Sequence, residues 1–136
     1  MPSTYERGDS MKLEPDCIRD ILFVIEENTS YKVGIRYPDD KFASLSEKYT
    51  DMQIRYHLVQ MQKADLIEIG ETDEFYNIYI EDLTSKGHEF LANIRSDSNW
   101  ATVQHVCSKI GSKSINTLFA VGTNIMTILI KQYLGF

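Results

Sequence analysis

The stretch over residues 50–91 constrains the fold of this chain more than any other part of its sequence. It carries, in order, the patterns of a helix, a strand, an acidic turn, a second strand and a new helix. The apolar side chains change from helical spacing to the β-branched and aromatic runs of strands, and then back again. This alternation predicts an α+β fold in which a two-stranded hairpin lies between two helices.

The first helix of this stretch is expected to begin after Thr50. Thr50 and Gln53 have the spacing of a capping box, in which the hydroxyl accepts from an early backbone N–H and the amide side chain bonds back to the N-cap. Asp65 is expected to end the helix, because Asp tolerates the left-handed conformation better than most residues do. The apolar residues in between recur at helical spacing and predict a buried stripe of Ile54, Leu58 and Met61.

Two short strands are predicted over residues 66–69 and 75–80, which are rich in β-branched and aromatic side chains. Residues 70–74 separate them and begin with a glycine, so we expect a hairpin with a longer loop. The loop carries three carboxylates without the Asp-x-Asp-x-Asp-Gly register of a calcium site. We therefore interpret it as a solvated turn whose acidic residues are Glu71, Asp73 and Glu74.

The rest of the sequence predicts helices on both sides of this stretch and a third strand before it. Pro15 suits the first turn of a helix, and Gly111 suits a C-terminal cap. The predicted segments are a helix over 15–28, a strand over 31–37 that could pair with the hairpin, a helical turn over 44–49, and helices over 84–95 and 99–110.

The chain resembles bacterial winged-helix repressors in two stretches. Residues 54–58 (IRYHL), with Met61 and residues 64–67 (ADLI), are similar to their recognition helix and its exit. Residues 83–91 (LTSKGHEFL) are similar to the opening of the helix that follows the wing. The resemblance implies a winged helix-turn-helix with additional C-terminal helices, in which residues 11–96 form the winged-helix domain.

The chain over residues 11–134 also resembles a family of short, uncharacterised proteins from Gram-positive bacteria and their phages and prophages. That family typically opens with Met-Lys-Leu-x-Pro-Asp-x-Ile-Arg, which matches residues 11–19 here. Met11 therefore corresponds to the family's usual start, and the polar residues 1–10 are expected to be a disordered extension. Residues 97–136 are expected to be C-terminal helices within the same compact domain.

The composition predicts a cytoplasmic protein. The start of the chain lacks a charged segment followed by an apolar one, so no secretory signal is expected. The two cysteines, Cys17 and Cys107, lie far apart in helical contexts and have no CxxC partner. We interpret both as reduced, buried thiols rather than as a disulfide or a metal site.

The C-terminal segment is the second informative feature, because no charged residue occurs between Ser114 and Ile130. On a helix its apolar residues cover about half of the circumference, whereas docking on one small domain needs a stripe of only ~100°. Three explanations are open: self-association, a helix wrapped by its own domain, and membrane contact, for which the segment is short and polar. We favour a homodimer, with candidate interface residues Ile115, Leu118, Phe119, Ile125, Met126, Leu129 and Tyr133.

The winged-helix resemblance implies DNA binding, and a small transcriptional regulator of phage or prophage type. A homodimer would place the helix over residues 50–64 in the major groove at each half of a palindromic site. Gln can pair with adenine through two hydrogen bonds, and Arg can do so with guanine. The candidate DNA-binding residues are Thr50, Gln53, Arg55, Tyr56, Gln60 and Lys63.

The charge of the chain keeps a second function open. The formal net charge is −6, whereas affinity for DNA comes mainly from Lys and Arg side chains that neutralise phosphates. Between Asp51 and Asp82 only Arg55 and Lys63 are basic. The alternative is a non-catalytic protein-interaction module, an inhibitor or adaptor whose acidic wing binds a basic partner through Glu71, Asp73 and Glu74.

The sequence offers little catalytic chemistry. His57, His88 and His105 are scattered, and no two of them have the spacing of a helical metal pair. No phosphate-binding glycine loop, nucleophile elbow or Cys–His arrangement with family spacing is present. We therefore expect no enzyme activity, no metal and no cofactor.

Overall fold

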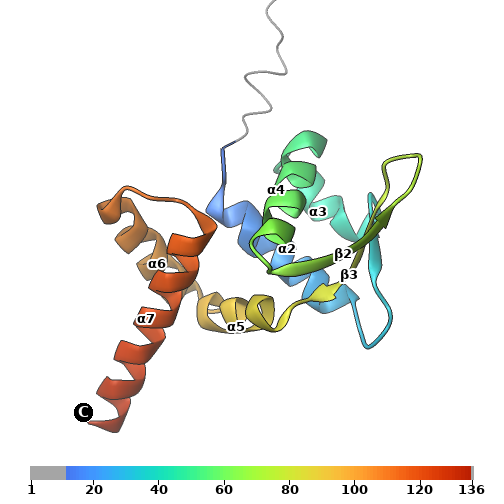
Figure 1. Ribbon diagram of the computed structural model, residues 1–136. Coiled ribbons are helices and arrows are strands. Elements are labelled where there is room, and N and C mark those ends of the chain that lie inside the picture. Colours follow the sequence, from blue (N-terminus) through green and yellow to red (C-terminus); the bar gives the residue numbers. More distant parts are fainter. Residues whose placement is uncertain (1–11, 136) are drawn as a thin grey trace, which may run out of the picture.

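A computed structural model describes residues 12–135 of the chain. The expectation that residues 1–10 form a disordered extension lies outside the described residues. Six α-helices, one 3₁₀ helix and three strands occur within them (Figure 1). In chain order they are α2 (Pro15–Asn28), β1 (Ile35–Tyr37), η1 (Asp40–Phe42), α3 (Ala43–Ser46), α4 (Asp51–Lys63), β2 (Ile67–Thr72), β3 (Ile78–Leu83), α5 (Ser85–Ile94), α6 (Asp97–Ile110) and α7 (Ile115–Leu134).

The α+β class predicted from the sequence is confirmed. The three strands form an antiparallel sheet in the order β1-β3-β2, so the central strand is the second strand of the hairpin. Ile35 of β1 lies opposite Ile80 of β3, and Tyr37 lies opposite Ile78. The predicted third strand therefore exists, although only its last three residues pair with β3.

The hairpin loop lies further along the chain than the sequence predicted. The strands extend to Thr72 and begin again at Ile78, so the loop comprises residues 73–77. The prediction of a loop over 70–74 is wrong, and Glu71 belongs to β2. The reason is local: the Asp73 carboxylate accepts hydrogen bonds from the backbone of Phe75 and Asn77 and so holds residues of high β propensity in a turn.

Helix α4 begins and ends as predicted. Thr50 and Gln53 form both hydrogen bonds of a capping box. Asp65 has a φ of 63°, and the backbone N–H of Leu66 returns to the carbonyl of Met61. The predicted stripe of Ile54, Leu58 and Met61 is fully buried. Local sequence chemistry therefore fixes the position of this helix.

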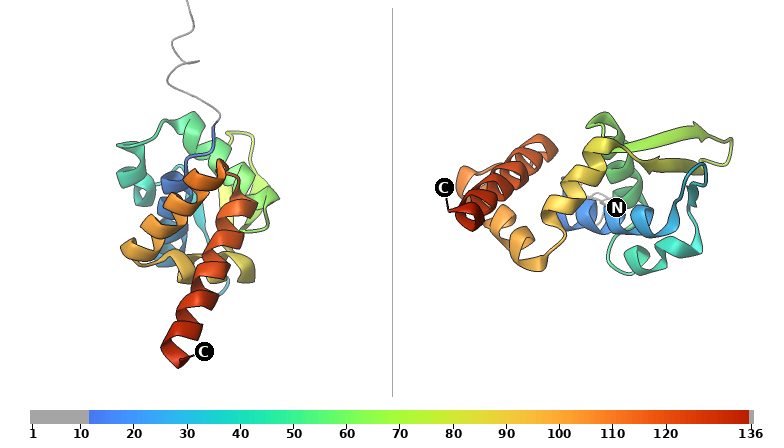
Figure 2. Two further views of the ribbon diagram at one scale, coloured as in Figure 1. Left: turned by 90° about the vertical axis from the view of Figure 1, so that its left-hand side faces the viewer. Right: turned by 90° about the horizontal axis from the view of Figure 1, so that it is seen from below.

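Helix α2 occupies the centre of the packing. It contacts the central strand β3 as well as α3, α4 and α5. Its buried face is apolar throughout, and Pro15 stands in its first turn as predicted. Seen from below, the hairpin lies at one end of the molecule and the helices α6 and α7 lie at the other (Figure 2). The buried residues of α2 are Cys17, Ile18, Ile21, Leu22, Val24 and Ile25.

The two C-terminal helices form a pair that is attached through α5. Arg19 of α2 donates hydrogen bonds to the carbonyls of Ile94 and Arg95, which fixes the turn between α5 and α6. Gly111 ends α6 with a φ of 82°, as expected for a C-terminal cap. The first half of α7 packs on α5 and α6, and its second half extends past the body of the domain (Figure 1). No helix among the described residues is long and apolar enough to span a membrane.

The contact between α5 and the start of β2 depends on a glycine. Gly87 is buried, and a Cβ atom at this position would lie 2.0 Å from the carbonyl oxygen of Leu66. The same carbonyl accepts a hydrogen bond from the backbone of Thr84, the residue that caps α5. Any larger side chain at position 87 must therefore push α5 away from the strand.

Substitution Gly87→Ala is expected to lower the free energy of unfolding by about 2 kcal/mol or more, because the backbone of Leu66 has to move. Urea unfolding followed by circular dichroism measures the change. Gly122→Ala in α7 is the matched control, since its Cβ would meet only side chains at ordinary contact distance, those of Ile94, Phe90 and Asn93 at 3.6, 3.8 and 3.9 Å. This control should gain up to ~1 kcal/mol from helix propensity. Equal stability of the two variants would contradict the close contact.

Candidate functional site

Helix α4 has one face in the core and one face in solvent. His57 completes the buried face, with no exposed surface. Its Nε2 accepts a hydrogen bond from the backbone N–H of Glu14 at 2.8 Å, and its Nδ1 lies 2.7 Å from the carbonyl of Gln53. Burial lowers the pKa of His57, so the ring is neutral and acts as an acceptor. The helix is thereby anchored to the segment that leads into α2.

The first two candidate DNA-binding residues serve the helix itself. The hydroxyl of Thr50 accepts from the backbone of Gln53 at 3.1 Å, and the amide oxygen of Gln53 accepts from the backbone of Thr50 at 2.9 Å. Gln53 therefore has only its amide nitrogen left for another partner. A bidentate contact to adenine needs both ends of the amide, and in Gln53 it would require opening the cap.

Arg55 connects three elements instead of pointing freely into solvent. Its Nε donates to the Asp51 carboxylate at 2.9 Å, and its Nη1 donates to the carbonyl of Tyr76 in the hairpin loop. The guanidinium also lies over the ring of Tyr37 in β1, 5.1 Å from its centre. The side chain is only 28% exposed. We call the group Tyr37, Asp51, Arg55 and Tyr76 the Arg55 latch.

The ionisation states of the latch residues also stabilise it. The Tyr37 hydroxyl donates to the second oxygen of Asp51 at 2.7 Å. Although burial raises the pKa of Asp51, the hydrogen bonds from Tyr37 and Arg55 outweigh it and lower the pKa below its ordinary value. Burial and the same Asp51 contact raise the pKa of Tyr37. At neutral pH the latch therefore holds a carboxylate, a neutral phenol and a guanidinium. Arg55, one of the candidate DNA-binding residues, therefore already has partners within the chain.

The loop at the end of the hairpin is an ordered turn with two exposed rings. The Asp73 carboxylate accepts from the backbone of Phe75 and from both the backbone and the side chain of Asn77. These hydrogen bonds lower the pKa of Asp73. Tyr76 has a φ of 61°, which is uncommon for a bulky residue. The side chains of Phe75 and Tyr76 are each 74% exposed. Sequence reasoning missed this aromatic tip, although an Asp two residues before Phe75 is the signal of such a turn.

Three candidate residues on α4 remain available to a partner. Tyr56 and Gln60 are half-buried and Lys63 is exposed. None of their side chains forms a hydrogen bond or an ion pair within residues 12–135. Gln60 and Lys63 line a shallow groove that also includes Lys86 and the start of α7. The polar surface that α4 offers is therefore concentrated in its C-terminal half.

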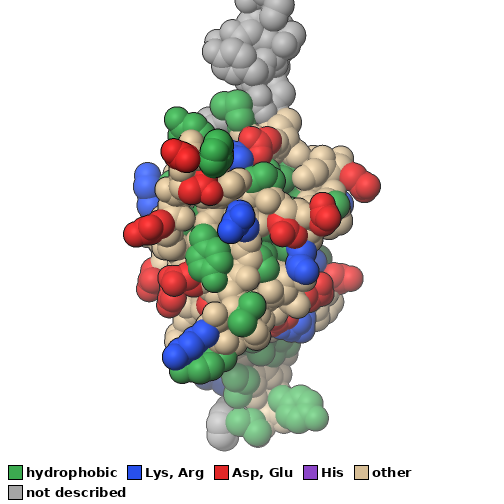
Figure 3. Space-filling view, turned by 90° about the vertical axis from the view of Figure 1, so that its right-hand side faces the viewer, with side chains coloured by type: hydrophobic (Ala, Val, Ile, Leu, Met, Phe, Trp, Pro, Cys, Tyr) green, Lys and Arg blue, Asp and Glu red, His purple; other side chains and the backbone are tan. Residues whose placement is uncertain are grey.

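Most acidic residues of the segment lie away from this surface, although Asp65 lines the groove beside Lys63. Glu68, Glu71 and Glu81 are exposed on the strands, and Glu74 is exposed in the loop. Acidic side chains are spread over the face that carries the hairpin, with basic and apolar groups between them (Figure 3). On α4 itself the carboxylate of Asp51 is paired with Arg55. The negative net charge of the chain is thus reflected in the exposed carboxylates of the hairpin more than in the side chains of α4.

The predicted dimer interface is divided between two environments. Ile115 and Leu118 are buried in the chain's own core, so their assignment to an interface with a second copy is wrong. Phe119 packs against Phe90 with 5.8 Å between ring centres. Ile125 and Met126 are half-buried. The exposed apolar residues of the second half of α7 are Ile128, Leu129, Ile130, Tyr133 and Leu134.

The fold and the site thus define a small α+β protein that presents a capped, polar-faced helix beside an acidic hairpin. The chain belongs to the family described as "Hypothetical protein (DUF2513)", whose model matches residues 12–113. It is similar to an uncharacterized protein of Haemophilus influenzae, with 29% identity over 127 residues that cover 92% of this chain and all of the relative. No solved structure matches the chain.

Membership of an uncharacterised family, expected from the sequence, is confirmed by this match. The matched residues include every element from α2 to α6, so α7 lies outside them. An origin in Gram-positive bacteria, phages or prophages stays a prediction, as does a cytoplasmic location. The relative from Haemophilus influenzae carries no functional description that could be transferred.

Substitution Arg55→Gln is expected to speed amide hydrogen exchange in residues 73–77 about fivefold or more, equivalent to about 1 kcal/mol, because the loop loses a charged hydrogen-bond donor. Hydrogen–deuterium exchange with mass spectrometry measures this. Lys63→Gln removes a cation from the same helix without touching the loop and is the control. Unchanged exchange in the Arg55→Gln protein would show that the latch does not order the hairpin.

Proposed function

We propose that this protein is a winged-helix DNA-binding regulator without catalytic activity, and that it contacts DNA through the solvent face of α4. The element order supports the proposal: α2, the short α3 and α4 are followed by a hairpin that pairs with β1. This is the order of a winged helix-turn-helix, in which the last helix of the triad enters the major groove. A fold alone does not determine a function, so the surface of α4 has to carry the proposal.

The observation that carries it is the chemistry of the free face of α4. Gln60 can form two hydrogen bonds with adenine, and Tyr56 can donate to a phosphate or contact a thymine methyl group. Lys63 can neutralise a phosphate. The carboxylate of Asp51 is paired with Arg55, so phosphates near this helix meet little repulsion from it. These three side chains are the part of the six candidate DNA-binding residues that we propose to contact DNA.

The charge distribution also suggests which side of α4 faces the DNA backbone. Lys63 and Lys86 line the groove at the C-terminal end of α4, where they outnumber the single carboxylate of Asp65. The start of α7, capped by Ser114, lines the same groove, and the N-terminus of a helix favours an anion. The hairpin carries carboxylates and would be repelled by phosphates. In the proposed complex the DNA backbone therefore crosses the α4–α7 groove, and the hairpin does not grip it.

Loss of Gln60 and loss of Lys63 are expected to affect DNA binding in different ways. Gln60→Ala should cost about 1–3 kcal/mol at a selected site and relax the preference at one base pair. Lys63→Ala should weaken binding to all sequences alike and reduce the salt dependence by about one phosphate contact. The sites are first selected from genomic fragments with the purified wild-type protein, and affinities are then measured by fluorescence anisotropy.

Lys109→Ala is the matched control for Lys63→Ala, because Lys109 is an exposed lysine on α6 away from α4. Thermal unfolding of each variant reports on the fold. Equal affinities for selected and scrambled DNA in the Gln60→Ala and wild-type proteins would remove Gln60 as a reader. Absence of any DNA binding by the wild type would overturn the proposed function.

A second function is favoured by the aromatic tip of the hairpin. Phe75 and Tyr76 are held in an exposed, ordered loop, and aromatic residues of this kind are frequent at the centre of protein interfaces. Glu71 and Glu74 flank them, which suits a partner with a basic rim around an apolar pocket. In this alternative the protein is an adaptor or inhibitor. Wild-type protein that binds no DNA would favour it over the regulator.

We further propose that the regulator is a homodimer joined through the second half of α7. This part of the helix extends past the body of the domain and exposes apolar side chains, of which Tyr133 is 93% exposed (Figure 1). Such a surface is costly in water unless another molecule covers it. A second copy is the simplest cover, since two-fold symmetry pairs like surfaces. A symmetric dimer would also place two α4 helices on a palindromic site.

Substitution Leu129→Glu is expected to convert the dimer into a monomer, because it places a charge inside the apolar contact between the two α7 helices. Sedimentation velocity over a range of protein concentrations measures the state of association. Ile110→Glu is the control, since Ile110 is an exposed apolar residue at the end of α6, outside the extended part of α7. A wild-type protein that sediments as a monomer at all concentrations would contradict the dimer.

A further inference from the structure

His57 is a titratable side chain inside the core, at the contact between α4 and the segment that leads into α2. The ring has no exposed surface. Its Nε2 accepts from the backbone N–H of Glu14 at 2.8 Å, and its Nδ1 donates to the carbonyl of Gln53 at 2.7 Å. A ring nitrogen that faces an N–H group must be an acceptor, so the proton of the neutral ring is on Nδ1. The two partners therefore determine the tautomer.

The hydrogen bond from Glu14 connects three parts of the structure. Glu14 is the N-cap residue of α2, and its carbonyl accepts from the backbone of Cys17 and Ile18. Its own N–H has the His57 ring as its hydrogen-bond partner within residues 12–135. Leu13, the residue before it, lines the groove between α4 and α7. The bond thus joins the start of α2 to α4 and keeps Leu13 beside the groove.

A proton added to Nε2 would break this bond. An imidazolium has two donors and no acceptor, so its Nε2–H would stand opposite the N–H of Glu14. Two donors that face each other in the interior both lack a partner, which costs free energy. Leu13 and Glu14 are only half-buried and can move into water. The fully buried stripe of Ile54, Leu58 and Met61 holds α4 on the core, so the movement concerns the segment and not the helix.

Burial is the main influence on the ionisation of His57. It lowers the pKa of the ring and outweighs the carbonyl of Gln53 and the carboxylate of Glu14, which both raise the pKa. The ring is therefore neutral at pH ~7 and takes up a proton only in more acidic solution. The residues one turn away on α4 are uncharged, namely Gln53, Ile54, Gln60 and Met61.

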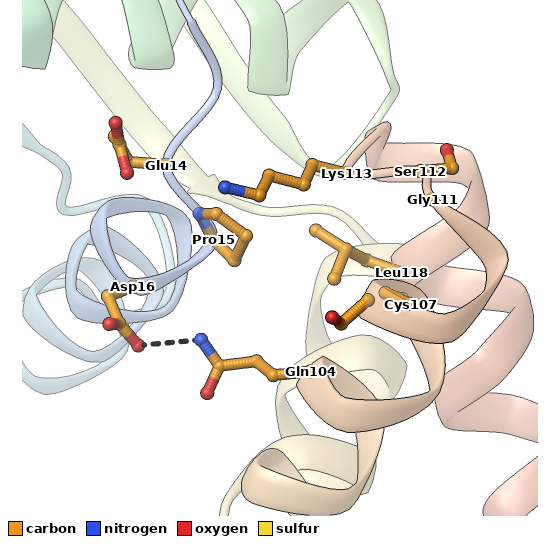
Figure 4. A pocket seen from close by; sticks show the side chains of 10 residues that line it. Glu14, Pro15, Asp16, Gln104, Cys107, Gly111, Ser112, Lys113 and Leu118 are labelled. Atoms are coloured by element: carbon orange, nitrogen blue, oxygen red, sulfur yellow. Dashed lines mark hydrogen bonds between the residues drawn. The ribbon is translucent and has the colours of Figure 1, made fainter.

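Charged groups on the other elements beside this contact do not bond to the ring. On α2, the carboxylate of Asp16 faces α6, and burial raises the pKa of the Cys17 thiol to about 12, so the thiol is neutral. Lys113 extends from the α6–α7 loop toward the start of α2 (Figure 4). Glu14 is the charged residue that acts on His57 within the described part of the chain. The groove beyond Leu13 carries three charges, those of Lys63, Asp65 and Lys86.

We propose that His57 is an acid-sensitive switch, which on protonation releases Leu13 and Glu14 from α4 while α4 stays on the core. An unfolded chain takes up the histidine proton near pH ~6.5, and the folded chain does so at lower pH. The stability that the neutral ring provides is therefore complete above pH ~6.5 and is lost as the pH falls toward the folded pKa. Release of Leu13 removes one wall of the α4–α7 groove.

An effect of the switch on DNA affinity rests on the proposed function, but the release itself does not. The release is therefore measured without DNA. Its failure would leave the DNA-binding proposal standing, and failure of DNA binding would leave the switch standing.

Two-dimensional ¹H–¹⁵N NMR of the full-length protein, titrated from pH ~8 to ~4, measures the release. The Glu14 amide signal should move with the same midpoint as the His57 ring signals, because both report on one hydrogen bond. The amide signals of Leu58 and Met61 should stay dispersed through this transition, as expected for a helix that remains folded. The proposal is overturned if the Glu14 amide keeps its position while the ring titrates, or if all amide signals collapse together.

His57→Gln is the variant that separates the switch from other acid effects, since its side-chain oxygen can accept from Glu14 but does not titrate. The transition at the Glu14 amide should be absent from this variant. Between pH ~7 and ~5 the wild type should also lose about 4 °C more in Tm than His57→Gln does. His105→Gln, which removes an exposed histidine on α6, is the matched control and should respond as the wild type. Equal losses of Tm in wild type and His57→Gln would contradict the switch.

Discussion

Burial of the apolar face of α2 is the constraint on which the rest of the structure depends. The helix contacts β3, α3, α4 and α5, and its inward residues have almost no exposed surface. Because α4 is held to the start of α2 by the Glu14–His57 hydrogen bond and by its own apolar stripe, its opposite face must point to solvent. The candidate site is therefore the surface that remains after the core has formed, and its composition is free to serve a partner.

Local chemistry explains which parts of the fold could be predicted from the sequence. The capping box at Thr50, the left-handed Asp65 and the cap at Gly111 each involve residues a few positions apart, and all three occur as expected. The shifted hairpin loop was missed because the side chain of Asp73 overrides the β propensity of the residues after it. The partner of Arg55 was missed because Tyr76 lies 21 residues away, and periodicity carries no information about such a contact.

The division of α7 shows the same limit at a larger scale. Its apolar pattern continues from one half of the helix to the other, yet Leu118 is fully buried and Tyr133 is almost fully exposed. The burial of α7 stops where its contacts with α5 and α6 stop, and the position of those helices is set by the tertiary structure. Two of the explanations offered for the sequence of α7, packing on its own domain and self-association, thus concern different halves of the helix. The first half is covered by its own domain, and the proposed second copy concerns only the second half.

The separation of charge within the domain makes the net charge a poor guide to the partner. The hairpin carries several exposed carboxylates, whereas α4 carries an internally paired Asp51 and an unpaired Lys63 within the described structure. A ligand that approaches α4 therefore meets a different field from one that approaches the hairpin, because exposed charges more than about 10 Å apart are largely screened at physiological salt. The one direct link between these two surfaces that we describe is the Arg55 latch, in which Arg55 pairs with Asp51 on α4 and donates to the carbonyl of Tyr76 in the hairpin loop.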